Sequence, residues 1–178
     1  MPRNKQRFLF GPEQSNAIRD LLQSIFVAEL LSPSKRLWFF FGWISDVEIL
    51  DNQAREFNSL EPDWPAAKIR LSKIMAALLS RGSEISLILR EDRQKHNKIF
   101  IENIKELIQQ YPDHIKIAWD KNEHNKAIVG DDFLLNGSMN LTYYGITING
   151  ENISMTTESS EVEEWRLHIE NRWNEKLK

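Results

Sequence analysis

The hydrophobic pattern of the first fifty residues changes from a helical period to a continuous run. After the helix-start residues Pro12-Glu13 and Ser15-Asn16, apolar side chains recur every three or four positions, at Ile18, Leu21, Leu22, Ile25, Phe26 and Leu30. This spacing predicts an amphipathic helix that ends near Ser32-Pro33. The run Leu37–Ile44 that follows is short, aromatic and apolar throughout. Such a run is typical of a strand buried on both faces, and we expect it to be the central first strand.

The next stretch, Asp51–Pro65, has no clear period and is predicted to be a long loop, a kind of segment that is often functional. It carries Trp64. We interpret this side chain as a lid over the edge of the core, with stacking on a ligand as the alternative.

Helical and strand patterns then alternate. The sequence predicts a helix over 66–80 that stops at Arg81-Gly82, a strand over 84–90, a helix from Phe100 to Tyr111 closed by Pro112, and a strand over 115–119. This order implies right-handed crossovers and an α/β fold, in which a mixed but mainly parallel sheet has helices on both faces. A further strand is expected over 153–157. A last helix should pack on the sheet through Val162, Trp165, Ile169, Trp173 and Leu177.

Length and composition favour one soluble globular domain, residues 1–178, with 41% hydrophobic and 28% charged residues. The chain has no cysteine, which excludes disulfides, a thiolate nucleophile and a Cys-based zinc site and fits a reducing compartment. The opening seven residues are basic, but the apolar run after them, Phe8–Phe10, is too short for a signal peptide. We therefore expect a cytoplasmic protein without a membrane segment. With a net charge of −3 and a pI near 5.9, it would have to hold a nucleic acid through a local patch.

Several reactive side chains gather between His124 and Asn140. Runs 126–129 and 132–136 are joined by Gly130-Asp131, which suits a two-residue hairpin turn. In that hairpin, position 128 faces 133, position 126 faces 135 and position 124 faces 137. Alternation then places His124 and Lys126 on one face of the sheet and Asn125 and Ala127 on the other. Asp131 stays at the turn and is not expected to touch a substrate.

This combination of groups suits a phosphate better than a metal ion. Lys126 offers a positive charge, Ser138 and Asn140 offer neutral donors, and the His124 imidazole can act as nucleophile, acid or base near neutral pH. The alternative is a surface hairpin with a solvated histidine and lysine. The triplet His96-Asn97-Lys98 has the same spacing, but no Gly-Ser-x-Asn follows it, and it opens an amphipathic segment instead.

The full pattern His124-x-Lys126-x4-Asp131-x5-Gly137-Ser138-x-Asn140 resembles the signature of the phospholipase D superfamily. The resemblance implies a phospholipase D-like α-β-α sandwich and a motif region over 124–152. It also implies catalysis by His124, Lys126, Asn140 and Glu151 without a metal or other cofactor. Lys126, Ser138 and Asn140 would bind the substrate, Asp131 and Gly137 would be structural, and Glu151 would hydrogen-bond to the histidine and orient it.

The motif occurs once, whereas the superfamily reaction uses two. The resemblance therefore implies a homodimer in which two His124 residues face each other across a twofold axis. Polar residues at strand ends, Ser45-Asp46, Arg90, Arg93 and Lys95, could lie near this site, because ligands of open α/β sheets bind at such edges. The alternative is that they are solvated loop charges.

The resemblance further implies a substrate class. By this resemblance, single-motif bacterial members of this size are mostly nucleases or parts of restriction and defence systems, and the chain would then act on DNA together with other subunits of such a system. Trp43–Asp46, Leu50–Asn52 and Leu60–Pro62 also resemble the phospholipase D-like protein encoded with bacterial 7-deazaguanine DNA-modification clusters. A non-catalytic or regulatory DNA-binding subunit is the second hypothesis. A lipid phosphodiesterase is the third, because no basic interfacial helix is evident.

Overall fold

A seven-stranded sheet runs through the computed structural model, which describes residues 6–177, so the basic opening lies mostly outside the description. The strand order is β1-β9-β8-β7-β2-β5-β6. Strand β2 is interior, as expected, but it is neither the first strand, because β1 precedes it in the chain, nor the middle one, which is β7. The strands are β1 (Gln6–Phe10), β2 (Arg36–Phe41), β5 (Glu84–Arg90), β6 (Ile115–Asp120), β7 (Ala127–Val129), β8 (Leu134–Gly137) and β9 (Asn152–Thr156).

Parallel pairing is confined to one half of this sheet. Strands β2, β5 and β6 are parallel neighbours, whereas β7, β8, β9 and β1 join the sheet through antiparallel pairs. The sheet is thus mixed, as expected, but less parallel than the sequence suggests. Helical crossovers join β2 to β5 and β5 to β6 and return the chain in the same direction, whereas β7 and β8 form a hairpin and β9 and β1 add to it in antiparallel pairs.

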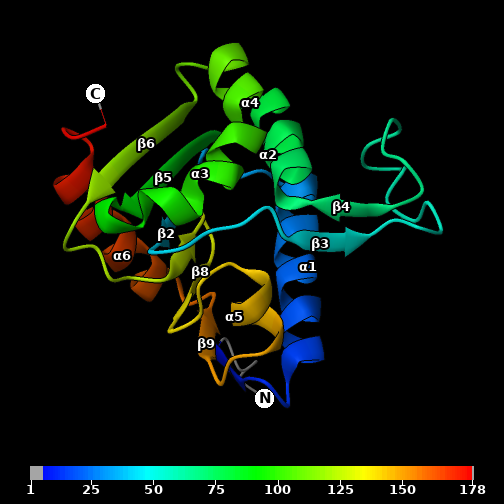
Figure 1. Cartoon of the computed structure of the whole chain (residues 1–178), viewed down its shortest axis with the longest axis horizontal. Coiled ribbons are helices and arrows are strands. Elements are labelled where there is room, and N and C mark those ends of the chain that lie inside the picture. Colours follow the sequence, from blue (N-terminus) through cyan, green and yellow to red (C-terminus); the bar gives the residue numbers. More distant parts are fainter. Residues whose placement is uncertain (1–5, 178) are drawn as a thin grey trace.

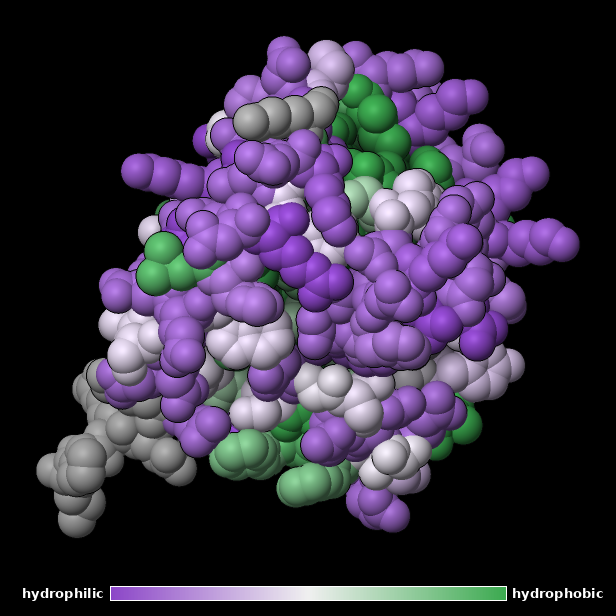
Figure 2. Space-filling model, turned by 90° about the vertical axis from the view of Figure 1, so that its left-hand side faces the viewer, coloured by the Kyte–Doolittle hydropathy of each residue, from purple (hydrophilic) through white to green (hydrophobic). Residues whose placement is uncertain are grey.

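Helices cover both faces of the sheet (Figure 1). One face carries α1 (Ser15–Leu31), α2 (Leu71–Ser80), α3 (Gln94–Asn103), α4 (Lys105–Gln110) and the short α5 (Tyr143–Thr147), and the other carries α6 (Ser159–Trp173). Alternation along β2 explains this layering, because Phe39 belongs to the cluster under α1 whereas Trp38 and Phe40 pack against Trp173 of α6. Figure 2, which views the side with α6 and β6, shows a mainly hydrophilic outer surface.

Most predicted elements are confirmed, and the differences concern short elements or the ends and divisions of helices. The segment before α2 was expected to be helical, yet Lys68–Arg70 forms β4, which pairs with β3 (Glu48–Asp51) in a second small sheet. Ile69 is 2% exposed, so one buried apolar residue on a strand was mistaken for part of a helical stripe. The expected helix up to Tyr111 is divided into α3 and α4 and is preceded by the 3₁₀ turn Glu91–Arg93. Strands β1 and β3 and helix α5 are too short to be recognised from a period.

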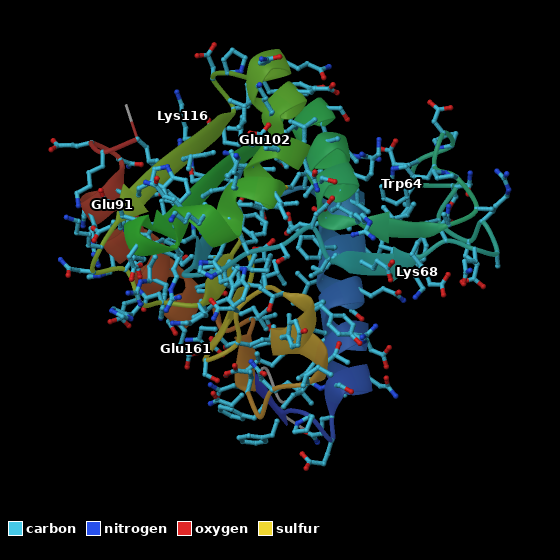
Figure 3. All side chains as sticks on the ribbon, viewed as in Figure 1. Trp64, Lys68, Glu91, Glu102, Lys116 and Glu161 are labelled. Carbon is cyan, nitrogen blue, oxygen red and sulfur yellow. The ribbon has the colours of Figure 1, made fainter. Side chains whose placement is uncertain are left out.

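The long loop lies between β3 and β4 and forms the tip of an arm that projects beside α1 (Figure 1). Asn52, which is fully buried, holds the loop together: its side chain bonds to Phe57 N, Asn58 Oδ1 and the Pro65 carbonyl. Trp64, labelled in Figure 3, is only 7% exposed and packs in the main core. The interpretation of Trp64 as a lid over the core edge is therefore confirmed.

Candidate active site

Five chain segments meet at one edge of the large sheet. Because β2 and β5 are parallel while β7, β8 and β9 alternate in direction, the ends of β2, β5 and β8 lie beside the starts of β7 and β9. The residues that these strand ends carry include Gly42, Arg90, His124, Lys126, Ser138, Asn140 and Glu151. The motif residues are thus brought together with two segments that lie far from them in sequence.

The hairpin differs from its prediction by two positions. Ile128 pairs with Leu135, and Lys126 O accepts a hydrogen bond of 3.1 Å from Gly137 N. The predicted partners were Phe133 and Leu135, respectively. The connection is longer than two residues, with Gly130 N bonded to Phe133 O, because the buried Phe133 side chain belongs to the turn and not to the strand.

A shift of an even number of residues leaves each side chain on its own face. Asn125 accordingly lines a cleft under α6, whereas Lys126 lines a small cavity with Phe41 and Leu135 on the α1 face. The prediction that positions 125 and 126 point to opposite faces is therefore confirmed. His124 precedes β7, and its neighbour Arg90 locates it at the same edge.

Asp131 lies at the turn, at the end of β7 that points away from this edge. Its Oδ2 accepts a hydrogen bond of 2.8 Å from Lys35 N, and its Oδ1 lies 2.7 Å from Arg166 Nη1 of α6. These contacts tie the hairpin turn to the start of β2 and to α6. They agree with a structural role for the motif aspartate.

His124 has a cation as its neighbour. Arg90 Nη1 lies 3.3 Å from His124 Nδ1. A guanidinium can only donate, so in this arrangement Nδ1 accepts and the ring proton is on Nε2. Arg90 is itself held by Asp92, whose pKa is lowered chiefly by the hydrogen bond from Arg90. Of the strand-end residues selected in the sequence, Arg90 is the one that reaches the histidine.

Glu151 does not fill the place that the resemblance implies. Its Oε2 accepts a hydrogen bond of 2.5 Å from Ser138 Oγ, and its Oε1 accepts one of 3.2 Å from Asn149 Nδ2. Over residues 6–177 no hydrogen bond joins Glu151 to His124. Since Ser138 Oγ also accepts from Asn152 N, the glutamate and serine fix the start of β9 against the end of β8.

Lys126 and Asn140 remain available to a ligand. Lys126 Nζ donates to His124 O at 2.6 Å, and in the part of the chain that the structure describes no carboxylate pairs with it. Asn140 Oδ1 accepts a hydrogen bond of 3.0 Å from Trp43 N, which points the oxygen toward the backbone and leaves the NH₂ group as donor.

Two glycines at this edge, Gly42 and Gly137, allow neighbouring segments to pack closely against the backbone. A Cβ at Gly42 would lie 3.2 Å from Arg90 Cδ, a tight contact, so glycine at the end of β2 leaves room for the arginine side chain. A Cβ at Gly137 would lie 2.1 Å from Asn152 O, which no side chain could tolerate. The motif glycine is therefore required by the packing of β8 on β9.

Sequence reasoning missed two residues that build this edge. Asn97, in the triplet that resembles the motif, is fully buried: its Oδ1 accepts from Ile44 N and its Nδ2 donates to Gly42 O. Its position three residues before Phe100, on the apolar stripe of α3, could have revealed it. Glu123 is 1% exposed and links the motif segment to α6. Its Oε1 accepts from Asn125 N, and its Oε2 lies 3.7 Å from Arg172 Nη2 of α6.

The other strand-end residues serve different purposes. Ser45 N donates to Leu141 O, and the Asp46 carboxylate accepts from Ser72 N and Oγ at the start of α2. Arg93 and Lys95 are exposed. These two residues are therefore solvated surface charges, as the alternative interpretation of the sequence had it.

Comparison with known proteins identifies the family of the chain. Residues 62–173 match the family described as "Cardiolipin synthase, PLD-like domain". The chain is a member of the phospholipase D superfamily. It carries a single copy of the full superfamily motif, His-x-Lys followed by Asp and by Gly-Ser-x-Asn, which begins at His124 and Lys126.

Solved structures of other phospholipase D-like proteins share the fold. NucT from Helicobacter pylori is similar with a TM-score of 0.63 and 14% identity, over 94% of each chain. Nuc from Salmonella typhimurium, a phospholipase D family member, is similar with a TM-score of 0.62 and 20% identity, over 95% of this chain and 93% of that one. TrmBL2, an archaeal chromatin protein, is similar with a TM-score of 0.54 and 9% identity, over 97% of this chain and 53% of that one. No curated protein sequence matches the chain.

The groups at this edge are hydrogen-bond donors of the kind that suit an oxyanion. A guanidinium, an ammonium, an imidazole and a carboxamide NH₂ converge there, and all four can donate to phosphate oxygens when the imidazole is protonated. Within residues 6–177 no three His, Asp or Glu side chains are grouped as metal ligands, and no helix is long and apolar enough to cross a bilayer.

Proposed function

We propose that this phospholipase D-like protein is a metal-independent phosphodiesterase, specifically a nuclease, that acts as a homodimer. The observation that carries the proposal is the convergence of His124, Lys126, Arg90 and Asn140 at one edge of the sheet. Three donors around one imidazole suit the charge that develops on a phosphate in the transition state. The fold that the chain shares with Nuc and NucT supports this choice.

The reaction would proceed in two displacements. Nε2 of one His124 attacks phosphorus, the bond to the leaving oxygen breaks, and that oxygen takes a proton from His124 of the partner subunit. Water then attacks the phosphohistidine, gives its proton to the partner's His124, and the P–N bond breaks. Lys126 and Asn140 would stabilise the non-bridging oxygens in both steps. Because one imidazole must be neutral and the other protonated, we expect a bell-shaped dependence of rate on pH.

In the single chain, Nδ1 of His124 accepts from Arg90, so the imidazole is neutral and its one proton is on Nε2. Neither reacting histidine can keep this form. The attacking imidazole needs a proton on Nδ1 and a free lone pair on Nε2, and the acid needs protons on both nitrogens. Arg90 would therefore release Nδ1 in both subunits when the substrate binds, and its guanidinium could then turn to the phosphate.

Mixing subunits tests the shared site. Wild-type protein is combined with increasing amounts of His124→Ala, the chains are allowed to exchange, and cleavage of DNA is measured in EDTA. A site built from two chains predicts that activity per wild-type chain falls in proportion to the wild-type fraction. His168→Ala, which changes an exposed histidine on α6, is the matched control and should not dilute the activity. Constant activity per wild-type chain would reject the shared site.

The covalent step has its own test. A diester with labelled phosphate should leave label on His124 as a phosphoramidate, which survives alkali and is lost in acid, and the product should retain its configuration at phosphorus. Direct attack by water would give inversion and no labelled protein. Inversion with the wild-type protein would therefore refute the covalent route even if His124 proves essential.

A second candidate is a non-catalytic or regulatory DNA-binding subunit. It is favoured by the shared fold with TrmBL2, whose reported structure "shows a novel mode of DNA binding". In this case the protein would bind DNA but yield neither product nor label. A lipid phosphodiesterase ranks third, and hydrolysis of phosphatidylglycerol vesicles in place of DNA would favour it.

We further propose that residues 1–178 act as one domain in the bacterial cytoplasm, within a DNA-modification or defence system and with other subunits of that system. The support is the resemblance of Trp43–Asp46, Leu50–Asn52 and Leu60–Pro62 to the protein of 7-deazaguanine clusters. Cleavage of matched DNA strands with guanine or 7-deazaguanine tests this point. Equal rates on both strands would argue against recognition of the modification.

A further inference from the structure

A groove lies on the α1 face of the molecule, and Thr142, two residues after the motif asparagine, is part of its lining. It lies between the loop after β2, helix α5 and the β3–β4 arm, and it encloses a cavity of about 670 Å³. In Figure 1 the arm crosses in front of α1, and α5 lies lower, to the left of α1; both helix α5 and strand β3 contact α1. A cavity of this size can accommodate a ligand of several rings.

The groove is joined to the candidate active site by backbone contacts. Trp43 N donates to Asn140 Oδ1, Ser45 N donates to Leu141 O, and Ile44 forms a parallel bridge with Leu141. Helix α5 begins directly after these residues, and its N-cap Thr142 accepts from Gly145 N. A chain-like substrate with one phosphate at Asn140 would therefore continue into the groove.

Exposed aromatic rings line this groove. Trp43, Tyr143 and Tyr144 are 38%, 57% and 61% exposed. The two tyrosine rings lie edge to face, with centroids 5.9 Å apart, and the Trp43 ring leans edge-on against His96 at 4.8 Å. Exposed rings of this kind beside a phosphate site provide stacking surfaces for unpaired bases, and stacking does not depend on the sequence of the strand.

The charges of the groove suit a strand with few phosphate contacts. Arg19, Lys68 and Arg70 line it, and Figure 3 shows Lys68 on the arm. Two carboxylates line it as well: Glu48 is 3.1 Å from Lys68 and 3.7 Å from Arg70, and Asp46 is bound to Ser72. The three cations of the groove thus outnumber its two carboxylates by one. We therefore expect the three aromatic rings to contribute more than the charges to the binding of a strand.

We propose that this groove binds a single strand of nucleic acid by stacking its bases on Trp43, Tyr143 and Tyr144, next to the phosphate held at His124. This inference rests on the proposed function, since it concerns the substrate of the same site. A duplex hides the faces of its bases, so it could not use these rings. The proposal therefore makes the protein selective for single-stranded substrates.

The test measures binding with full-length His124→Ala protein, which cannot consume the probe. The probes are a fluorescent single-stranded DNA of twelve nucleotides, the same strand in RNA, its DNA duplex, and a strand of abasic sites with the same number of phosphates. We expect the single strands with bases to bind at least about tenfold more tightly than the duplex or the abasic strand. The affinity should fall with salt with a logarithmic slope between about −2, for the three groove cations, and about −3.5, if Arg90 and Lys126 also contact phosphates. DNA and RNA arms show which sugar is preferred.

Variants locate the contact. Tyr143→Ala and Tyr144→Ala should each weaken binding of the single strand about tenfold, while Tyr143→Phe and Tyr144→Phe should keep most of it, because stacking needs the ring and not the hydroxyl. Phe10→Ala is the matched control, since Phe10 is 58% exposed on β1 and lies outside the groove, and it should bind like the parent. Circular dichroism of each variant verifies that it is folded.

Three results would overturn the proposal. Equal affinity for the abasic strand and the normal strand would show that phosphates alone are bound. Tyrosine variants that weaken self-association in sedimentation but not DNA binding would assign the rings to a second copy of the chain. Tyrosine variants that lose binding to phosphatidylglycerol vesicles but keep binding to DNA would assign the rings to a membrane surface. Hydrolysis of bis(p-nitrophenyl) phosphate by the wild-type protein is measured in parallel: if it occurs without base-dependent binding, the groove proposal fails while the phosphodiesterase proposal stands.

Discussion

Arg90 Nη1 lies 3.3 Å from Nδ1 of His124, so a guanidinium at the end of β5 faces the nitrogen that the family resemblance assigns to a glutamate. The contact brings together two residues that are 34 positions apart in the chain. We propose that Arg90 positions the imidazole before substrate binds and becomes a phosphate ligand once substrate is bound. Both roles can be measured.

Replacement of Arg90 by alanine should change the tautomer of His124 as well as the rate. Without the donor at Nδ1, the ring proton is no longer held on Nε2, and the ¹⁵N chemical shifts of the His124 ring should move toward a mixture of tautomers. Phosphodiester cleavage should fall by about two orders of magnitude, as for loss of a positioned donor. Arg93→Ala, which changes an exposed arginine one turn later, is the control. Unchanged ¹⁵N shifts in Arg90→Ala would show that the contact does not position the ring.

His124→Ala should abolish cleavage and leave the fold intact, because it removes the attacking nitrogen from one half of the site and the acid from the other. Lys126→Met should cost about 3 kcal/mol in the transition state, on the order of one oxyanion contact. Lys98→Met repeats the second change in the look-alike triplet of α3 and should retain full activity. The measurement is kcat/KM on a DNA substrate. Wild-type rates for both motif variants would disprove the site assignment.

A dimer is expected at micromolar concentration in sedimentation velocity, since the chain contains one motif and the reaction requires two histidines. Dilution should reduce specific activity once the dimer dissociates. A protein that is monomeric and fully active at every concentration would contradict the proposed mechanism.

Asp131→Asn should act on stability and not on catalysis. Its carboxylate accepts from Lys35 N and pairs with Arg166, and loss of the charge should lower the free energy of unfolding by about 1–2 kcal/mol. Urea denaturation measures this change. Asp132→Asn, at the exposed neighbouring position, should have little effect. If Asp131→Asn instead lowered kcat with unchanged stability, the aspartate would have a role at the site.

Stability should fall as pH rises because of Glu29. Burial raises the pKa of this carboxyl, and the hydrogen bonds from Ser34 N and Oγ only partly oppose the shift. A raised pKa in the folded state stabilises the fold below the ordinary carboxyl pKa, and this contribution is lost as pH rises through the raised value. Glu29→Gln should therefore flatten the dependence of unfolding free energy on pH in that range, whereas exposed Glu13→Gln should not. Parallel curves for wild type and Glu29→Gln would contradict the assignment.

The sequence by itself determined the family motif and the principal elements. Long amphipathic helices such as α1 and α6 and buried runs such as β2 and β5 are visible because their periods persist over many residues. The motif can likewise be recognised from the sequence alone, through the spacing of His124, Lys126, Gly137, Ser138 and Asn140. The faces of positions 125 and 126 were predicted correctly despite a wrong register, because a two-residue shift preserves alternation.

Only the tertiary structure decided what surrounds the histidine. Arg90, Asn97 and Trp43 reach the site from strand ends and a helix far away in the chain, and no local period reports such contacts. The same holds for Glu151, whose hydrogen bonds to Ser138 and Asn149 depend on how β9 pairs with β8. A motif fixes which groups are near one another along the chain, whereas the direction of each strand fixes which ends meet at one edge. That direction is a property of the whole sheet, and here it places two cations and an aromatic groove beside a single imidazole.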